Sequence, residues 1–130
     1  MSWPPPVELH GAQATLRPLS GDHHDALCAA TRDGELWRLW YTSVPSPEGM
    51  AAEIDRRLAL QTAGSMLPFT VRDAAGRVVG MTTFMNIDAT NRRVEIGSTW
   101  TAASAQRSAL NTQCKRLLLA HAFEDRKSVG

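Results

Sequence analysis

The chain has 130 residues, of which 43% are hydrophobic and 21% charged, a composition typical of a globular protein with enough residues for one core. Lys and Arg number 14 against 13 Asp and Glu, and this formal net charge of +1 gives no reason to expect nucleic acid or a membrane as a partner. Residues 1–8 have neither the basic start nor the apolar run of a signal peptide, and no segment reads as a membrane-spanning helix. The expected location is therefore cytoplasmic.

The first predicted elements are a strand and a helix. Gln13–Leu19 reads as a strand that is closed by Pro18, whose ring cannot donate a hydrogen bond to a neighbouring strand. Ser20 or Asp22 can cap the helix that is predicted over His23–Thr31.

A second helix is predicted after the turn at residues 44–47. Ser46 is expected to cap it and Pro47 to occupy its first position, where the missing N–H of proline costs nothing. Apolar residues at helical spacing continue to Ala63 and Gly64, where we expect the helix to end. The apolar positions are Met50, Ile54 and Leu58.

Three strands are predicted to follow as a meander. Residues 67–72 and 77–87 read as a hairpin, because the segment 73–76 between them contains the Asp and Gly that are typical of a turn. A loop at residues 88–91 then leads to a third strand at residues 92–100.

The stretch from Arg92 to Glu124 is the most informative part of the chain and reads as strand, loop and helix. Val94, Ile96, Ser98 and Trp100 alternate with Arg93, Glu95, Gly97 and Thr99, the period of a strand. A helix is predicted over Gln113–Glu124, with helical spacing at Leu110, Cys114, Leu117, Leu118 and His121. A strand that feeds a helix N-terminus through a loop of small residues can present several backbone N–H groups to an anion. The pattern predicts a phosphate-binding loop.

This strand, loop and helix resemble the GNAT superfamily of acyl-CoA N-acyltransferases, in particular the branch similar to the ribosomal-protein acetyltransferases RimJ and RimL. In that family the strand ends in an Ile-Gly-x-x-Trp-like segment, which here is Ile96–Trp100. The family's pyrophosphate loop reads Arg/Gln-x-x-Gly-x-Gly/Ala. Gln106 fits the first position of that loop, while Ala109 and Asn111 replace its two small positions.

The resemblance runs from Val7 to Glu124 and implies an α/β (α+β) GNAT-like acyl-CoA N-acyltransferase fold. That fold is a mixed, mostly antiparallel sheet flanked by helices, here expected without its C-terminal strands and helix. Residues 1–124 are accordingly interpreted as a partial GNAT N-acyltransferase domain. Residues 125–130 are interpreted as a non-native tail, because Asp125–Val129 match the translation of a common sequencing adapter. A natural frayed terminus is the alternative.

The activity implied by the resemblance is transfer of an acetyl group from acetyl-CoA to a primary amine, either a protein N-terminus or a small-molecule amine. The end of the strand is expected to hold the pantetheine arm and the loop to hold the pyrophosphate, largely through backbone groups. Neither a metal nor nucleic acid is expected to take part. The implied cofactor-binding residues are Ile96, Ser98, Trp100, Gln106, Arg107, Ser108, Ala109, Leu110, Asn111 and Thr112.

Glu95 is the candidate catalytic base. An ammonium group with a pKa near ~10 is almost wholly protonated at neutral pH, so the amine needs a base or a water relay before it can attack. Related enzymes often use a carboxylate in or near this strand. The alternative for Glu95 is a structural ion pair with Arg92, Arg93 or Arg77.

Four residues are candidates for binding the acceptor amine. Trp37, Trp40 and Tyr41 fall between the first two predicted helices, where the family shapes its acceptor cleft, although large aromatic residues are most often buried for packing alone. Asn86 lies at the end of the second predicted hairpin strand, where turn formation is the ordinary role of asparagine.

Two alternatives to an active acetyltransferase remain open at the level of sequence. The replacements at Ala109 and Asn111 are compatible with a non-catalytic CoA-binding or regulatory module. An inactive truncated fragment that forms a homodimer through an exposed sheet edge is the second alternative.

The two cysteines, Cys28 and Cys114, lie far apart in helix-like segments, without the spacing of a zinc site or a redox pair. We expect both to be reduced, buried thiols.

Overall fold

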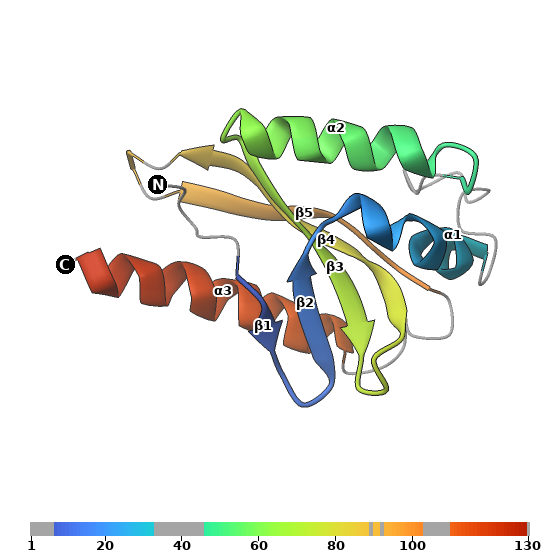
Figure 1. Cartoon of the computed structure of the whole chain (residues 1–130). Coiled ribbons are helices and arrows are strands. Elements are labelled where there is room, and N and C mark those ends of the chain that lie inside the picture. The colour runs from blue at the N-terminus through green and yellow to red at the C-terminus, as the bar shows by residue number, and fades with distance from the viewer. Residues whose placement is uncertain (1–6, 33–45, 89, 92, 103–109, 130) are drawn as a thin grey trace.

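The computed structural model describes residues 7–32, 46–88, 90–91, 93–102 and 110–129 and forms a five-stranded sheet with helices on both faces (Figure 1). In chain order the elements are β1 (Leu9–His10), β2 (Ala14–Pro18), the 3-10 helix η1 (Gly21–His23), α1 (His24–Arg32), α2 (Met50–Thr62), β3 (Met66–Asp73), β4 (Val78–Asp88), β5 (Arg93–Thr101) and α3 (Leu110–Val129). Figure 1 shows α1 and α2 on one face of the sheet and α3 on the other. The predicted fold class is confirmed.

The sheet is antiparallel throughout the described strands, in the order β1-β2-β3-β4-β5. The predicted β3–β4 hairpin is present, and its turn is closed by the Asp73 carboxylate, which accepts hydrogen bonds from the backbone N–H groups of Ala75 (3.0 Å) and Arg77 (2.9 Å). Gly76 adopts a φ of +85°, which a residue without a side chain tolerates at little cost. The two-residue strand β1 was not predicted from sequence.

Side-chain contacts identify the two faces of the sheet. The Thr83 hydroxyl on β4 accepts a hydrogen bond from Arg57 of α2 at 2.9 Å, so Thr83 lies on what we call the α1/α2 face. Its neighbour Phe84 points the opposite way, and its ring centroid lies 6.4 Å from that of His121 on α3. Phe84 therefore marks the α3 face. The core between these layers includes Leu16, Leu27, Met50, Phe69, Val79, Met81, Phe84 and Leu118, all fully buried.

Helix α2 begins later than the sequence predicted. Ser46 does cap a backbone N–H, but its hydroxyl accepts from Gly49 at 3.1 Å and closes a turn over Pro47–Gly49. The helix proper starts at Met50 with Gly49 as its N-cap. The prediction of a helix starting at Pro47 was wrong, because the same Ser-Pro pair also favours a tight turn.

The other helices agree more closely with their predictions. Ser20 caps the first helical turn, as expected, and receives the backbone N–H of Asp22. Helix α3 is longer than predicted, from Leu110 to Val129, and its backbone continues through most of the segment interpreted as a tail. The division of the chain at residue 124 stays a prediction. No helix within the described residues is long and apolar enough to cross a membrane.

The Gln113 side chain of α3 forms hydrogen bonds with the edge hairpin of β1 and β2. The Gln113 carbonyl oxygen accepts hydrogen bonds from the backbone N–H groups of Gln13 and Ala14, the second at 2.8 Å. A Cβ on Gly11 would meet the Gln113 amide carbon at 2.5 Å, so glycine leaves room for this contact. The first turn of α3 is thereby fixed against β2.

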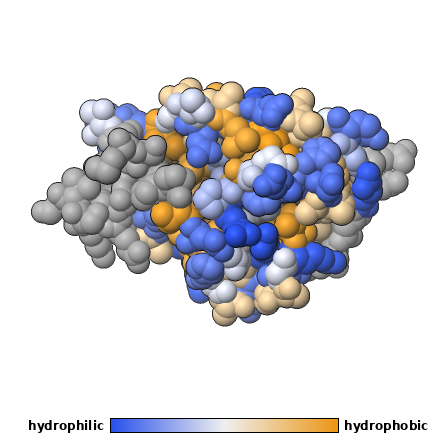
Figure 2. Space-filling model, viewed as in Figure 1, coloured by the Kyte–Doolittle hydropathy of each residue, from blue (hydrophilic) through white to orange (hydrophobic). Residues whose placement is uncertain are grey.

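Both cysteines are free and buried, as predicted. Burial raises the pKa of the Cys114 thiol on α3 to about 11, and it also raises the pKa of Cys28 on α1. On the outside, polar and apolar side chains are interspersed over the face seen in Figure 2. The large hydrophobic residues exposed in the described part of the chain are Val7 and Leu119.

A buried ion pair anchors α2 to the sheet. The Glu53 carboxylate receives Arg57 Nε at 2.8 Å and Arg56 Nε at 2.8 Å, but the Arg57 side chain is 3% exposed while that of Arg56 is 52% exposed. Arg57 also reaches Thr83 on β4. Burial lowers the pKa of Arg57, yet the ordinary value is so high that the guanidinium stays charged.

We expect Arg57→Ala to lower the free energy of unfolding by about 2 kcal/mol, because it removes buried packing and a charge-assisted hydrogen bond together. Arg56→Ala removes an exposed partner of the same carboxylate and should cost at most about 0.5 kcal/mol. Urea denaturation of both variants measures the difference. Equal losses would contradict the assignment of Arg57 as the anchor.

His23 is expected to make the stability of the fold depend on pH. Its Nδ1 lies 2.7 Å from the Thr70 hydroxyl and accepts the backbone N–H of Ser20 at 3.3 Å, which requires an unprotonated Nδ1. Burial, followed by the charges of Arg72 and Arg17, lowers the pKa of His23, whereas Asp22 opposes the shift. The folded state therefore favours the neutral imidazole.

The lowered pKa predicts a loss of stability as pH falls through about 6.5, the unfolded value, because the unfolded chain takes up a proton that the folded chain binds less well. The unfolding free energy of the wild type, measured in urea, should be lower at pH 5.5 than at pH 7.5. The difference between the two pH values should be smaller for His23→Gln. The control is His10→Gln, at an exposed histidine. An unchanged pH dependence in His23→Gln contradicts the prediction.

Candidate functional site

The pairing of β4 with β5 contains an additional residue on β5. Met81 pairs with Trp100 and Thr83 pairs with Gly97, so two steps along β4 match three steps along β5. Such a mismatch is a β-bulge, in which one residue is left outside the ladder of hydrogen bonds. It falls within the Ile96–Trp100 segment for which a pantetheine-binding role was predicted.

The bulge changes which face the end of β5 presents. Ile96 pairs with Phe84 and lies on the α3 face, whereas Trp100 pairs with Met81, three residues away along β4, and lies on the α1/α2 face. The strand predicted from alternation is confirmed, but its period does not continue through the bulge. Trp100 shares a face with Glu95 and Gly97 instead of with Ile96.

Close contacts hold the bulge on both sides. The hydroxyls of Thr82 and Thr99 lie 2.8 Å apart in a hydrogen bond, and the Thr99 hydroxyl also donates to the Gly97 carbonyl at 3.3 Å. Trp100 is 6% exposed, and its indole Nε1 is buried without a hydrogen-bond partner among the described residues. A buried N–H donor of this kind is uncommon in folded proteins.

Glu95 lies on the α1/α2 face and pairs in register with Met85. Its side chain is exposed, and its Oε2 accepts a hydrogen bond from the Asn86 amide at 2.9 Å. The structure thus brings together Glu95 and Asn86, two of the residues that sequence reasoning selected separately. Arg92, one of the arginines considered as an ion-pair partner, lies outside the described residues.

The other predicted cofactor-binding residues that the structure describes lie on either side of the segment 103–109. Leu110 is buried at the first position of α3, and Thr112, two residues further on, is exposed. Ser98 is in β5 and Asn111 in α3 by their backbones. The predictions that fall outside the described residues are Gln106, Arg107, Ser108 and Ala109 for the cofactor and Trp37, Trp40 and Tyr41 for the acceptor.

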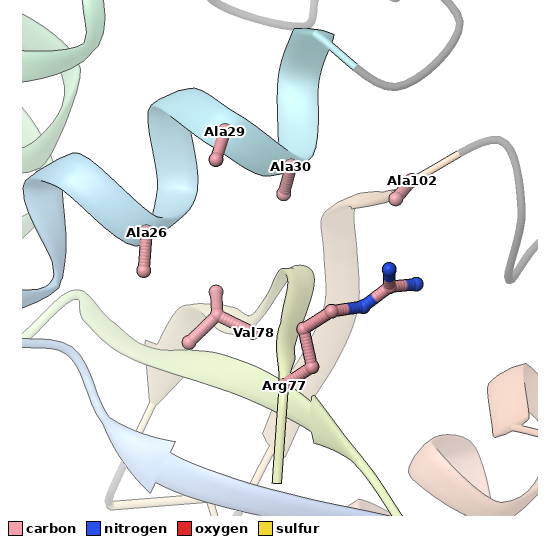
Figure 3. Close-up of a pocket in the computed structure, with 6 residues that line it drawn as sticks. All are labelled: Ala26, Ala29, Ala30, Arg77, Val78 and Ala102. Atoms are coloured by element: carbon pink, nitrogen blue, oxygen red, sulfur yellow. The ribbon is translucent and has the colours of Figure 1, made fainter. Parts of the chain in front are cut away.

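A small cavity of about 200 Å³ lies between α1 and the β4–β5 pair (Figure 3). The Arg77 guanidinium extends toward Ala102, the last described residue before segment 103–109. Sequence reasoning missed this cavity, because alanines carry no chemical signal. Its volume is below that of ordinary small-molecule sites, so it is no site for a whole acyl-CoA. The lining residues are Ala26, Ala29, Ala30, Arg77, Val78 and Ala102.

Comparison with protein families gives one match that covers most of the chain. The model of the acetyltransferase (GNAT) domain matches residues 13–128. A search of curated proteins gave no match.

Several solved structures are similar to the chain. A GCN5-related N-acetyltransferase from Brucella melitensis is 27% identical, with a TM-score of 0.77 over 93% of this chain and 56% of that protein. RimL, a ribosomal-protein alpha-N-acetyltransferase solved with coenzyme A, is 20% identical, with a TM-score of 0.71 over 88% of this chain and 66% of its own. Mycobacterium smegmatis RimJ, solved with CoA-disulfide, is 22% identical, with a TM-score of 0.76 over 95% of this chain and 65% of that protein. The chain thus spans 56% to 66% of the length of these proteins.

Two glycines make the close approach of β4 and β5 possible, and they predict different tolerance to substitution. A Cβ on Gly80 would lie 2.1 Å from the Trp100 carbonyl oxygen, whereas a Cβ on Gly97 would meet the Met85 sulfur at 2.5 Å. The Trp100 backbone cannot shift to make room for a new Cβ, whereas the flexible end of the Met85 side chain can. We expect Gly80→Ala to cost more than about 3 kcal/mol and Gly97→Ala about 1 kcal/mol.

Thermal and urea unfolding measure both losses. In a double-mutant cycle, Met85→Ala should reduce the cost of Gly97→Ala, because it removes the sulfur that the new Cβ meets. Met85→Ala should leave the cost of Gly80→Ala unchanged. A Gly97→Ala cost that does not depend on residue 85 contradicts the predicted contact.

Proposed function

Because the chain belongs to the acetyltransferase (GNAT) domain family, we propose that it transfers an acetyl group from acetyl-CoA to a primary amine. The family match over residues 13–128 is the observation that carries this proposal. The solved structures of RimL with coenzyme A and of RimJ with CoA-disulfide support a CoA thioester as the donor.

The bulge in β5 supports binding of the pantetheine arm at this strand. A bulged residue leaves backbone polar groups outside the ladder, and the amides and the thioester carbonyl of an acyl-CoA can pair with such groups. We assign Ile96, Ser98 and Trp100 to this role.

Segment 103–109 and the start of α3 are assigned to the pyrophosphate. The backbone N–H groups of a first helical turn have no intrahelical partners and attract anions. This assignment covers Gln106–Ala109 and continues through Leu110, Asn111 and Thr112. The link between Gln113 and β2 supports it, because it fixes the first turn of α3 relative to the sheet.

Glu95 is assigned as the base. In the proposed reaction it takes a proton from the acceptor ammonium, directly or through water, and the amine lone pair then forms a C–N bond to the thioester carbonyl carbon. The C–S bond breaks, the nitrogen loses its second proton, and the CoA thiolate takes up a proton. The exposed position of Glu95 on the α1/α2 face leaves its carboxylate accessible to an acceptor. Trp37, Trp40 and Tyr41 are proposed to line the acceptor side.

The acceptor amine is proposed to be a protein N-terminus or a small-molecule amine. RimL is described as an alpha-N-protein acetyltransferase, which favours testing N-terminal peptides first. The homodimer and the cytoplasmic location also stay predictions.

The proposal is tested by titrating the chain with acetyl-CoA in a thermal-shift assay and then measuring acetylation of N-terminal peptides and polyamines. We expect a CoA-dependent rise in Tm and a Glu95→Gln variant whose kcat is about 100-fold lower with unchanged CoA binding. Asp88→Asn, the same chemical change on the same hairpin, is the control and should retain activity. Absence of a CoA-dependent shift contradicts the proposal, whereas CoA binding without turnover supports a non-catalytic CoA-binding module.

A further inference from the structure

The end of β4 contains a second bulge, opposite Glu95. Met85 pairs with Glu95 and Asp88 with Arg93, so three steps along β4 match two along β5. Within this bulge Asn86 adopts a φ of +51°, and it is the one non-glycine residue with a positive φ in the described part of the chain. Asparagine tolerates this left-handed conformation better than most residues, but at a cost. Such local strain is often found where a side chain has a function.

In this bulge the Asn86 side chain is oriented toward Glu95, the candidate base. Its Nδ2 donates to Glu95 Oε2 at 2.9 Å, a normal hydrogen-bond length. Both residues are exposed, so without this contact the long Glu95 side chain would sample several rotamers in water. Bulges commonly re-aim a side chain beside an active site. The contact restricts Glu95 while leaving its second carboxylate oxygen available.

The bulge is also held by a hydrogen bond from the connection between α2 and β3. The backbone N–H of Ile87 donates to the Ser65 carbonyl at 3.1 Å, and the Ser65 N–H donates to Leu60 in the last turns of α2 at 3.1 Å. The position of Asn86 is therefore tied to the end of α2, the same helix that Arg57 anchors on β4.

From this geometry we propose that Asn86 is a positioning residue that orients the Glu95 carboxylate for proton transfer from the acceptor amine. This role replaces the acceptor-binding role that the sequence suggested, and it rests on the proposed acetyltransferase function. Within the described residues, Asp88 and Arg93 pair with each other in register two residues along β5 from Glu95, and Arg57 of α2 contacts Thr83, which pairs with Gly97. The side chain that donates a hydrogen bond to the Glu95 carboxylate in this part of the chain is Asn86.

The same hairpin provides a matched control pair. Asn91 Nδ2 donates to Asp88 Oδ2 at 2.8 Å, an exposed amide–carboxylate contact like that of Asn86 with Glu95. The contact lies in the turn between β4 and β5 and involves no residue assigned to the reaction. Asn91→Gly therefore removes an equivalent hydrogen bond without touching the proposed site.

The kinetic test compares Asn86→Gly with Asn91→Gly. Glycine keeps the left-handed backbone and removes the Asn86 side chain with its amide, so folding is retained. We expect Asn86→Gly to lower kcat about tenfold with KM for acetyl-CoA and amine unchanged, and to have no further effect in a Glu95→Gln background. Asn86→Asp should lower kcat more, because it places two carboxylates together. Asn91→Gly should match the wild type.

Other kinetic outcomes overturn the proposal. An unchanged kcat with a raised KM for the amine makes Asn86 an acceptor-binding residue, as the sequence suggested. Additive losses for Asn86→Gly and Glu95→Gln show that the two side chains act independently. If the wild type binds acetyl-CoA but acetylates no amine, the proposed function and the positioning role fail together.

A structural readout separates the two failures. In ¹⁵N–¹H spectra of the full chain, Glu95→Gln should move the side-chain amide resonances of Asn86 and leave those of Asn91 in place, whether or not the chain is active. Unmoved Asn86 resonances show that the contact does not form in solution and overturn the inference while leaving the proposed function intact.

Discussion

The positions of Glu95, Asn86 and Trp100 depend on how β4 pairs with β5. Each strand contributes one additional residue, β5 between Gly97 and Trp100 and β4 between Met85 and Asp88. The first bulge brings Trp100 to the face that carries Glu95, and the second brings Asn86 to the Glu95 carboxylate. A regular ladder would place Trp100 on the α3 face and would leave Asn86 in ordinary strand geometry. Two local irregularities therefore bring the three candidate residues to one face.

Much of the fold could be predicted from sequence, because its signals are local. The β3–β4 hairpin follows from two strand-like runs on either side of the turn at Asp73 and Gly76, and α3 follows from apolar residues at helical spacing. Strand β1 is two residues long, too short to show a period, and exists because it pairs with β2. The start of α2 was wrong because one Ser-Pro pair is compatible with both a helix cap and a tight turn. The GNAT resemblance, which rested on the strand and loop pattern, is confirmed by the family match.

The site was less predictable, because its geometry depends on contacts between distant residues. Glu95 and Asn86 could each be selected by chemistry, but their hydrogen bond requires a bulge that no local pattern indicates. The same holds for Arg57, whose partner Thr83 lies 26 residues away along the chain. Alternation predicted the strand at Ile96 but not the reversal of Trp100, since the reversal follows from the register with β4.

The two buried cysteines make the opening of the fold measurable. Cys28 lies in α1 and Cys114 in α3, on opposite sides of the sheet (Figure 1). Alkylating reagents attack the thiolate, and with a pKa of about 11 only about one Cys114 thiol in a thousand is ionised at pH 8 while it stays buried. Labelling of each cysteine is therefore governed by exposure of its own helix. Mass spectrometry of pulse-labelled protein can therefore measure the opening rates of the two helical layers separately.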